Sequence, residues 1–241
     1  MSPPEKPSPL DILRAQYEEL AELAGSLAHE MKNQLSVIHM NIGLLGEDMA
    51  EWETPQSRRS IERVEIVTEQ CERMEGLLRD FLNYATLRDI DLVSGSLNDQ
   101  IDTVLRAYAA DAKNRGVEIQ RFLDANLPAI ALHSDSLQAA LMNLVKNALE
   151  ATAAHGQLIA RTYTTKNSVA LELIDTGRGI ENNTILRMFE PFYTTKEGGS
   201  GLGLPTARKI IEAHGGRIAV DSTVGRGTKF TLEFPALKRL S

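Results

Sequence analysis

Leu27–Asn33 (LAHEMKN) lies within a run of apolar residues whose spacing decides the first part of the fold. Apolar side chains recur at alternating steps of four and three on both sides of this stretch, at Leu13, Tyr17, Leu20, Ala24, Leu27 and Met31 and again at Leu35, Ile38, Ile42, Leu45 and Met49. This spacing predicts a long helix with a narrow apolar seam. The extra step of four from Met31 to Leu35 is a stutter, which predicts either a strain point or a shift of packing layer.

A second run with the same spacing follows a polar segment, residues 51–57, that predicts a turn. Two such helices joined by a short link predict an antiparallel hairpin. Their apolar side chains are too numerous for one pair of helices to bury, so we expect a homodimer in which two hairpins form a four-helix bundle. The single cysteine, Cys71, excludes an internal disulfide, and we interpret it as a small core residue on the second seam.

His29 lies off the first seam and is expected to face water. Glu30 is its neighbour in the chain, and Asn33 follows one helical turn later on the same face. This arrangement offers a nitrogen nucleophile, an adjacent carboxylate base and an amide that could orient a water molecule. Taken alone the pattern is weak evidence, because most histidines on helices are solvated and have no chemical role.

The composition excludes some classes of function. The chain has 241 residues, of which 42% are hydrophobic and 24% charged, with a net charge of −7 and no Lys/Arg-rich run. A nucleic-acid-binding surface is therefore not expected. No run is long and apolar enough for membrane insertion, and no signal peptide is recognisable, so we expect a cytoplasmic protein.

The second half of the sequence alternates between helical and strand patterns. Helices are expected over residues 96–114, 137–154 and 202–213, and strands over 117–122, 129–132, 158–163, 168–174, 217–220 and 228–234. This mixture predicts an α/β sandwich, a layer of helices on a mixed sheet. The predicted organisation is a leader (1–9), the helical hairpin (10–92), a linker (93–95), the α/β domain (96–236) and a short tail (237–241).

Two polar motifs in this domain suggest ligand binding. Asn143 and Asn147 are expected on one helix face with Lys146 beside them, where amide oxygens suit Mg²⁺ and the lysine could meet a phosphate. The alternative is a polar helix face without a ligand. Asp175–Gly179 (DTGRG) follows an apolar strand, and its aspartate could accept a hydrogen bond from an exocyclic amine such as that of adenine. The alternative is a glycine turn that closes the strand.

Two further motifs could contact phosphates. Phe189–Lys196 (FEPFYTTK) ends in Thr194, Thr195 and Lys196, whose side chains could reach phosphate oxygens. Gly198–Leu204 (GGSGLGL) leads into a helix, and glycine-rich turns at a helix N-terminus offer backbone N–H groups to phosphates. The motif is neither a Walker loop nor a dinucleotide fingerprint. The candidate phosphate-binding residues here are Gly199, Ser200, Gly201, Leu202 and Gly203.

Together these motifs resemble the conserved boxes of the histidine-kinase family, in the family's order and separations. Asn143–Ala148 resembles the N box, Asp175–Gly179 the first glycine box, Phe189–Phe192 the F box and Gly199–Gly203 the second glycine box. His29–Asn33 resembles the H box. The resemblance extends from about Leu10 to Pro235. It implies a dimeric phosphoacceptor hairpin joined to a GHKL-type ATP-binding domain, the Bergerat fold shared with DNA gyrase and MutL.

The resemblance also implies roles for residues of the ATP site. Asn147 would bind Mg²⁺ with Asn143 close to it, and Asp175 would bind the adenine amine. Gly177 and Gly179 would line the base pocket, Gly201 and Gly203 would hold the phosphates, and Thr228 would lie near the adenine. Residues 178–200 would form a mobile lid.

For the chemistry, the resemblance implies that His29 attacks the γ-phosphate of ATP with Glu30 as general base. The phosphoryl group would then pass to an aspartate of a response-regulator receiver domain. Asn33 would orient a water molecule for dephosphorylation of that partner.

The sequence departs from the family pattern after Asn33, where Gln34 replaces the usual proline, so we expect a straighter first helix at this point. Pro205 lies near the start of a helix, where proline costs little. Two alternative functions remain open at this point. One is an ATPase or serine kinase of the same fold, such as an anti-sigma-factor kinase, and the other is a non-catalytic scaffold that binds a receiver domain.

Overall fold

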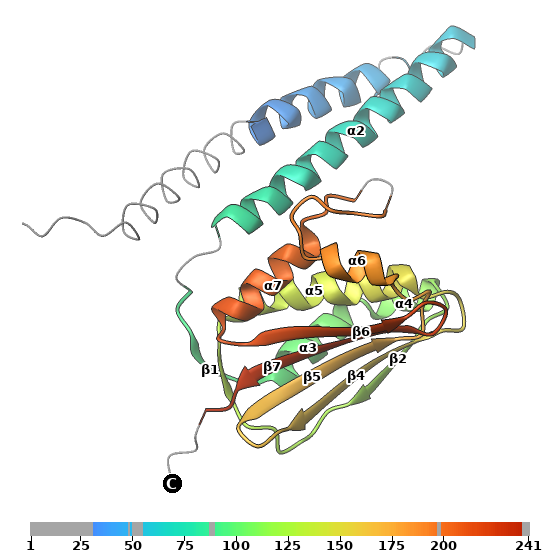
Figure 1. Cartoon of the computed structure of the whole chain (residues 1–241). Helices are drawn as coiled ribbons and strands as arrows, with labels where there is room; N and C mark the ends of the chain where they lie inside the picture. The colour runs from blue at the N-terminus through green and yellow to red at the C-terminus, as the bar shows by residue number, and fades with distance from the viewer. Residues whose placement is uncertain (1–30, 48, 50–54, 87–89, 197–198, 238–241) are drawn as a thin grey trace, which may run out of the picture. The chain divides into compact units, whose positions relative to one another are not determined.

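The structure is a computed structural model that describes residues 31–47, 49, 55–86, 90–196 and 199–237. The chain divides into two compact units, Met1–Thr86 and Leu87–Ser241. Figure 1 shows the helices of the first unit and the α/β architecture of the second. The two units are described separately below.

The described part of the first unit is a helical hairpin. Residues 31–47 are helical, and helix α2 spans Pro55–Thr86. Ser36 Oγ donates to Glu75 at 3.3 Å, and a Cβ on Gly46 would lie 3.1 Å from Val64. From Ser36 to Gly46 on the first helix, the contacted residue on α2 moves back from Glu75 to Val64. The two helices are therefore antiparallel, as predicted. The predicted turn extends too far, because α2 already begins at Pro55, where proline suits the first helical position.

The hairpin buries only part of its apolar surface. Leu35 and Cys71 are buried between the helices, which confirms the interpretation of Cys71 as a core residue. Many other large apolar side chains remain at least one third exposed: Met31, Val37, Ile38, Met40, Leu44, Leu45, Ile66, Val67, Met74 and Leu77. An apolar surface of this extent needs a further packing partner.

The second unit is built on a five-stranded sheet with the order β2-β4-β5-β7-β6. The strands are β2 (Glu118–Phe122), β4 (Gln157–Thr164), β5 (Ser168–Asp175), β6 (Arg217–Thr223) and β7 (Gly227–Pro235). Strands β2 and β4 are parallel, and the other neighbours are antiparallel. Strand β5 alternates buried and half-buried positions from Leu171 to Asp175, as expected for a strand with one covered face.

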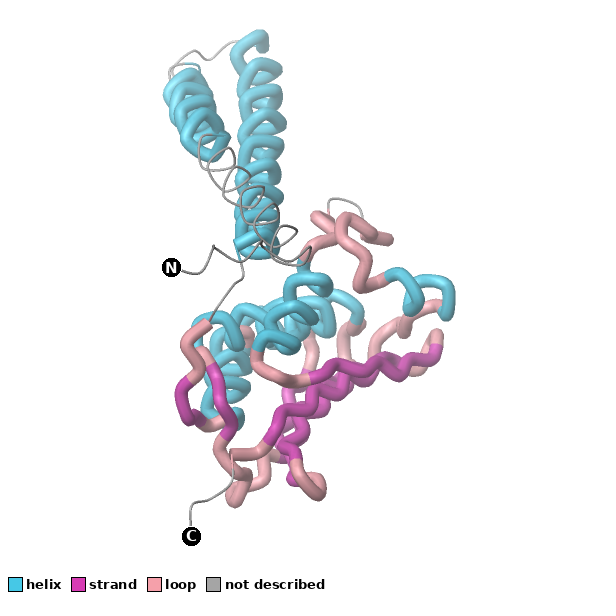
Figure 2. Tube along the Cα trace, turned by 60° about the vertical axis from the view of Figure 1, so that its left-hand side comes forward, coloured by secondary structure: helices cyan, strands magenta, loops and turns pink. Residues whose placement is uncertain are grey.

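Helices cover one face of this sheet, as Figure 2 shows. They are α3 (Leu97–Ala107), α4 (Ala109–Asn114), α5 (Ser134–Ala151) and α7 (Gly203–Ala213). The core between the layers contains Leu141 and Leu144 of α5, Ile211 of α7, and Leu171 and Phe234 of the sheet. The predicted α/β sandwich is therefore confirmed.

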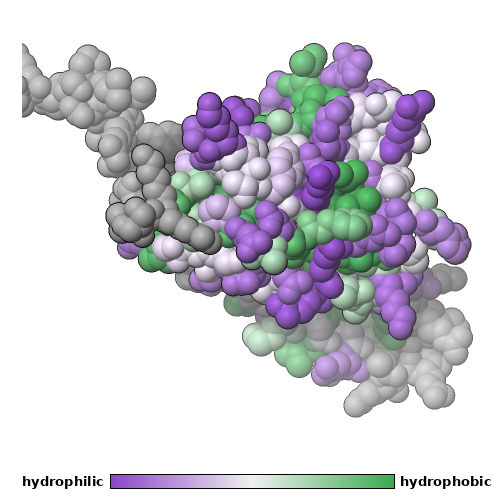
Figure 3. Space-filling view, turned by 90° about the horizontal axis from the view of Figure 1, so that it is seen from below, coloured by the Kyte–Doolittle hydropathy of each residue, from purple (hydrophilic) through white to green (hydrophobic). Residues whose placement is uncertain are grey.

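The opposite face of the sheet carries polar pairs across neighbouring strands. Lys229 Nζ lies 3.4 Å from Asp221 Oδ2, Arg217 is paired with Glu233, and Tyr163 Oη donates to Glu172 at 3.2 Å. In Figure 3, which looks at the molecule from below, hydrophilic side chains are spread widely and hydrophobic ones form small patches. Cross-strand pairs of opposite charge suit a solvent-exposed sheet face.

Two local predictions were wrong, and one helix was not predicted. Residues 93–95, predicted as the linker, form strand β1 (Val93–Gly95), which pairs with β3 (Ile130–Leu132); a strand of three residues is too short to show a periodic pattern. The predicted helix over 96–114 is interrupted at Tyr108. Helix α6 (Asn182–Arg187) was not predicted within the lid segment, because it has no buried face to give it a pattern.

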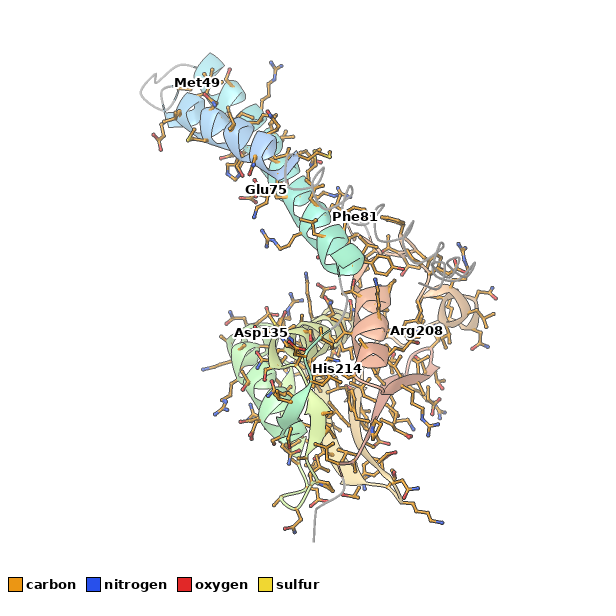
Figure 4. All side chains as sticks on the ribbon, turned by 90° about the vertical axis from the view of Figure 1, so that its left-hand side faces the viewer. Met49, Glu75, Phe81, Asp135, Arg208 and His214 are labelled. Carbon is orange, nitrogen blue, oxygen red and sulfur yellow. The ribbon has the colours of Figure 1, made fainter. Side chains whose placement is uncertain are left out.

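A buried histidine joins the end of α7 to the start of α5. His214 is 3% exposed, and its Nε2 accepts a hydrogen bond from the His133 N–H at 3.0 Å. The proton must then lie on Nδ1, which donates to the Ile210 carbonyl at 2.7 Å. Figure 4 labels His214 and, in the first turn of α5, Asp135. This pair of hydrogen bonds helps to set the spacing of the two helices.

We expect His214→Ala to lower the free energy of unfolding of the second unit by about 2–4 kcal/mol, because it leaves a cavity and a buried N–H without its acceptor. Urea unfolding followed by circular dichroism measures this change. His155→Asn is the matched control, since His155 is exposed and has a φ of 67° that asparagine tolerates. Equal stabilities of the two variants would contradict the role of His214.

Candidate functional site

Helix α5 presents the polar groups of the N-box motif on one stripe. Its side that carries Leu137, Leu141, Leu144, Val145 and Leu149 is buried against the core, so its opposite side faces outward. Asn143, Asn147 and Glu150 follow one another at steps of four and three and therefore lie along one stripe of that side. The predicted common face of Asn143 and Asn147 is confirmed, whereas Glu150 was not recognised as part of it.

Asp175 ends strand β5 as a buried carboxylate, 3% exposed. Its Oδ1 accepts hydrogen bonds from the backbone N–H groups of Gly177 at 2.9 Å and Thr228 at 3.3 Å. Burial raises the pKa of this carboxyl above its ordinary value, and the two N–H donors oppose that shift by stabilising the ionised form. The site therefore holds an acceptor oriented by backbone on two sides.

The turn after Asp175 packs closely against α5. A Cβ on Gly177 would lie 2.5 Å from the carbonyl oxygen of Ala151, so only glycine permits this approach. The next N–H, that of Arg178, donates to the same carbonyl at 3.1 Å. Gly179 lies against Thr223 of β6. The first glycine box is thus held between the end of the N-box helix and the β6–β7 hairpin.

Thr228 belongs to a small hydroxyl cluster beside Asp175. Its Oγ1 lies 2.9 Å from Ser222 Oγ, which in turn accepts from the Ile180 N–H at 2.9 Å. Ser222 was missed by the sequence analysis. Its position on β6, paired with Thr228 of β7, could have indicated it only once the strand register was known.

The second glycine box joins the F box to the start of α7. The Phe192 N–H donates to the Gly201 carbonyl at 3.1 Å, and both residues have a positive φ, 65° and 67°. A Cβ on Gly201 would lie 2.5 Å from the Phe192 carbonyl carbon, so glycine is required there. Ser200 Oγ accepts from the Leu202 N–H at 3.2 Å, and Leu202 is buried. These contacts shape the turn before the helix N-terminus.

Gly203 is the first residue of α7 and lies beside the N box. A Cβ at this position would be 3.4 Å from Asn143 Oδ1. The N-terminus of α7 and the polar stripe of α5 are therefore neighbours. A helix N-terminus attracts anions through its N–H groups and its dipole, so this junction suits a phosphate.

The lid segment carries the remaining predicted residues. Thr194 and Thr195 are exposed, and Thr194 Oγ1 accepts from the Lys196 N–H at 3.1 Å. The ammonium group of Lys196 lies 2.6 Å from Asn147 Oδ1 and 2.5 Å from Glu150 Oε2. Lys146 Nζ lies 4.0 Å from the other oxygen of Glu150 and remains mostly exposed. The structure thus brings Lys196 to the N-box helix.

The donor set at Asn147 fits a divalent cation. Its amide oxygen already accepts a cationic group, the ammonium of Lys196, and oxygen donors of this kind are those that Mg²⁺ prefers. No group of three or more His, Cys, Asp or Glu residues within the described part of the chain could hold a metal ion. Few protein ligands are expected for a Mg²⁺ ion that is held largely by nucleotide phosphates and water.

The H-box motif is only partly described. His29 and Glu30 lie outside the described residues, whereas Asn33 and Gln34 are exposed residues of the 31–47 helix. The predicted common face of His29 and Asn33, off the seam, stays a prediction. The pairing of His29 with Glu30 stays a prediction.

Comparison with known proteins assigns a family to both units. The family model of the His Kinase A (phospho-acceptor) domain matches residues 19–90. That of the histidine kinase-, DNA gyrase B- and HSP90-like ATPase matches residues 133–238. The sensor histidine kinase ZraS of Escherichia coli K12 is 31% identical over 216 residues, which are 90% of this chain and 45% of ZraS.

Solved structures give the same result. Full-length ShkA in complex with AMPPNP has a TM-score of 0.72 at 25% identity, over 91% of this chain and 47% of ShkA. The histidine kinase ThkA in complex with the response regulator TrrA has a TM-score of 0.65 at 25% identity, over 93% of this chain and 64% of that chain.

The chain spans about half the length of the curated relatives it matches. In the part of the chain that the structure describes, none of the helices has the length and apolar character needed to cross a membrane. The four box motifs of the second unit, the helical hairpin and the matches over both units lead to one conclusion: the chain belongs to the sensor histidine kinase family.

Proposed function

We propose that this protein is an ATP-dependent protein-histidine kinase that phosphorylates His29 and passes the phosphoryl group to an aspartate of a response-regulator receiver domain. One observation carries the proposal. Asn147, Asp175 and Gly203, which are distant in the sequence, are all built into the polar edge where α5 meets the Asp175 turn and the start of α7. Such an edge offers an adenine acceptor, a cation ligand and a phosphate site together.

The nucleotide is proposed to bind along this edge. Both N–H groups described above reach Oδ1 of Asp175, so we assign Oδ2 to the adenine amine. Gly177 and Gly179 line the base, and Thr228 contacts it from β7. The phosphates lie at Gly201 and Gly203, where the N-terminus of α7 stabilises their charge.

Asn147, with Asn143 beside it, would hold Mg²⁺. When bound, the ion neutralises charge on the phosphate oxygens. The lid residues Thr194, Thr195, Lys196, Gly199 and Ser200, together with Leu202 and Lys146, are proposed to surround the phosphates. Lys146 suits this role because its side chain is 63% exposed.

In the transfer step, an imidazole nitrogen of His29 attacks the γ-phosphorus, the P–O bond to the β-phosphate breaks, and ADP leaves. Glu30 accepts the proton of the other ring nitrogen, so the product is an uncharged imidazole ring that carries the phosphoryl group on a P–N bond. That bond breaks when the phosphoryl group passes to the receiver aspartate. Asn33 lies one helical turn after His29, where its amide could orient water for dephosphorylation of the receiver.

The exposed apolar face of the hairpin supports a homodimeric four-helix bundle. ThkA was solved in complex with a response regulator, and we propose a partner of that class here. We place the reaction in the cytoplasm, where ATP is available. We propose no nucleic-acid partner, in line with the net charge of −7.

His29→Gln is expected to abolish incorporation of the γ-phosphate of ATP while leaving ATP affinity within about twofold, since glutamine has no nucleophilic nitrogen and residue 29 is outside the nucleotide-binding unit. Incubation with γ-labelled ATP measures incorporation. The label on the unchanged protein should be lost in acid and survive base. A label that survives acid would indicate a serine kinase instead, and no label despite ATP binding would indicate a scaffold.

Asp175→Asn is expected to weaken ATP binding about 10- to 100-fold, the loss expected for a hydrogen bond to a charged acceptor. The same change should raise the melting temperature of the protein at pH 7 without nucleotide. Burial raises the pKa of Asp175, so the ionised group costs stability above that pKa and the cost disappears as the pH falls below it.

The stability difference between Asp175→Asn and the unchanged protein should therefore shrink as the pH is lowered toward 4. Thermal unfolding between pH 4 and 8, together with calorimetric titration of ATP, measures both effects. Asp221→Asn is the matched control, since Asp221 is an exposed carboxylate on the open sheet face. Unchanged ATP affinity in Asp175→Asn would contradict the adenine assignment.

A further inference from the structure

We propose that Glu150 is a positioning residue that docks Lys196 of the lid on Asn147, so that the lysine ammonium and the divalent cation compete for one amide oxygen. The inference rests on the proposed function for the identity of the cation. It assigns to Glu150 a role in controlling entry of the nucleotide–metal complex.

The contacts connect segments that are far apart in the sequence. Lys196 Nζ lies 2.6 Å from Asn147 Oδ1 and 2.5 Å from Glu150 Oε2. Asn147 and Glu150 are three residues apart on α5, so their side chains project side by side. Lys196 reaches both of them from the lid. These bonds therefore connect the lid directly to the N-box helix.

The loop around Lys196 is shaped to present this side chain. Thr194 Oγ1 accepts from the Lys196 N–H at 3.1 Å, and the Gly199 N–H donates to the Lys196 carbonyl at 3.2 Å. A Cβ on Gly199 would lie 2.7 Å from Thr194 Oγ1, so a larger residue would disturb the turn. The backbone on both sides of the lysine is thus held by local hydrogen bonds.

Two cations cannot use Asn147 Oδ1 together at low cost. Mg²⁺ binds oxygen ligands at about 2.0–2.1 Å and keeps most of its water shell. An ammonium group on the same oxygen would face that shell and would repel a dication at short range. Docking of Lys196 and binding of Mg²⁺ at Asn147 are therefore mutually exclusive.

Glu150 decides the strength of the docking. Among the ion pairs of the described residues, Glu150 is the only carboxylate paired with Lys196. The other oxygen of Glu150 lies 4.0 Å from Lys146 Nζ. Lys196 is 35% exposed and Glu150 28% exposed, so water screens the pair and the docking is weak enough to be reversed. Displaced from Asn147, Lys196 would be available to contact phosphate.

Trypsin tests the docking directly in the full chain without Mg²⁺ or nucleotide. Cleavage after Lys196 requires its side chain to enter the protease pocket, which docking prevents. Glu150→Gln should speed this cleavage about two- to fivefold, the range expected for a partly exposed ion pair. Cleavage after Lys166, an exposed lysine in the β4–β5 turn, is the internal reference and should not change.

The matched control is Glu212→Gln, which removes a carboxylate paired with Arg208 on α7 and should leave cleavage after Lys196 unchanged. Equal rates of cleavage after Lys196 in the unchanged protein and in Glu150→Gln would overturn the proposal. Thermal unfolding confirms that each variant is folded.

A magnesium titration gives the second measurement, with a fluorescent ADP analogue as the probe. Mg²⁺ should raise the affinity for ADP, and the quantity measured is the Mg²⁺ concentration that gives half of this rise. Glu150→Gln should lower that concentration by about two- to fivefold, because Lys196 then competes less well for Asn147. A rise in that concentration would show that Glu150 helps to hold the metal and would overturn the proposal. If the unchanged protein binds no adenine nucleotide, the proposed function fails, and the cleavage rates alone decide the docking.

Discussion

The second unit depends on backbone segments that contact one another directly. Such contacts form only where a glycine places no side chain between the two segments. Gly177 lies against the Ala151 carbonyl at the end of α5, and a side chain on Gly227 would overlap the Asp175 carbonyl. These two contacts hold α5, the end of β5 and the β6–β7 hairpin at backbone distance. Asn147, Asp175 and Thr228 are carried by these three segments. Their mutual geometry therefore follows from the glycines rather than from the polar groups themselves.

Much of this arrangement could be predicted because the signals are local. The alternating apolar steps predicted the hairpin, since helical periodicity is repeated over many turns. The α/β sandwich followed from the order of helices and strands, and the spacing of Asn143 and Asn147 placed both on one face of α5. The structure places Asp175 at the end of β5, where an apolar run followed by two glycines had indicated a strand and a turn.

The features that were missed depend on contacts between distant segments. Ser222 gains its role from the β6–β7 register, and His214 from the start of a helix that lies 81 residues earlier in the chain. Glu150 was not recognised because its role depends on Lys196, which lies 46 residues later in the chain. Strand β1 exists because β3 pairs with it, and Gly95 gives room for the Leu132 side chain. No periodic pattern in the sequence encodes such pairings.

The pairing of β1 with β3 also sets the length of the connection between the two units. Helix α2 ends at Thr86 and β1 begins at Val93, so six residues separate them. Fully extended, that connection spans at most roughly 25 Å. Ile130 of β3 also forms a β-bridge with Ala236 near the other end of the unit, so the connection is attached to the body of the fold. The connection therefore enters the second unit at a point that both the first and the last strand segments of that unit hold in place.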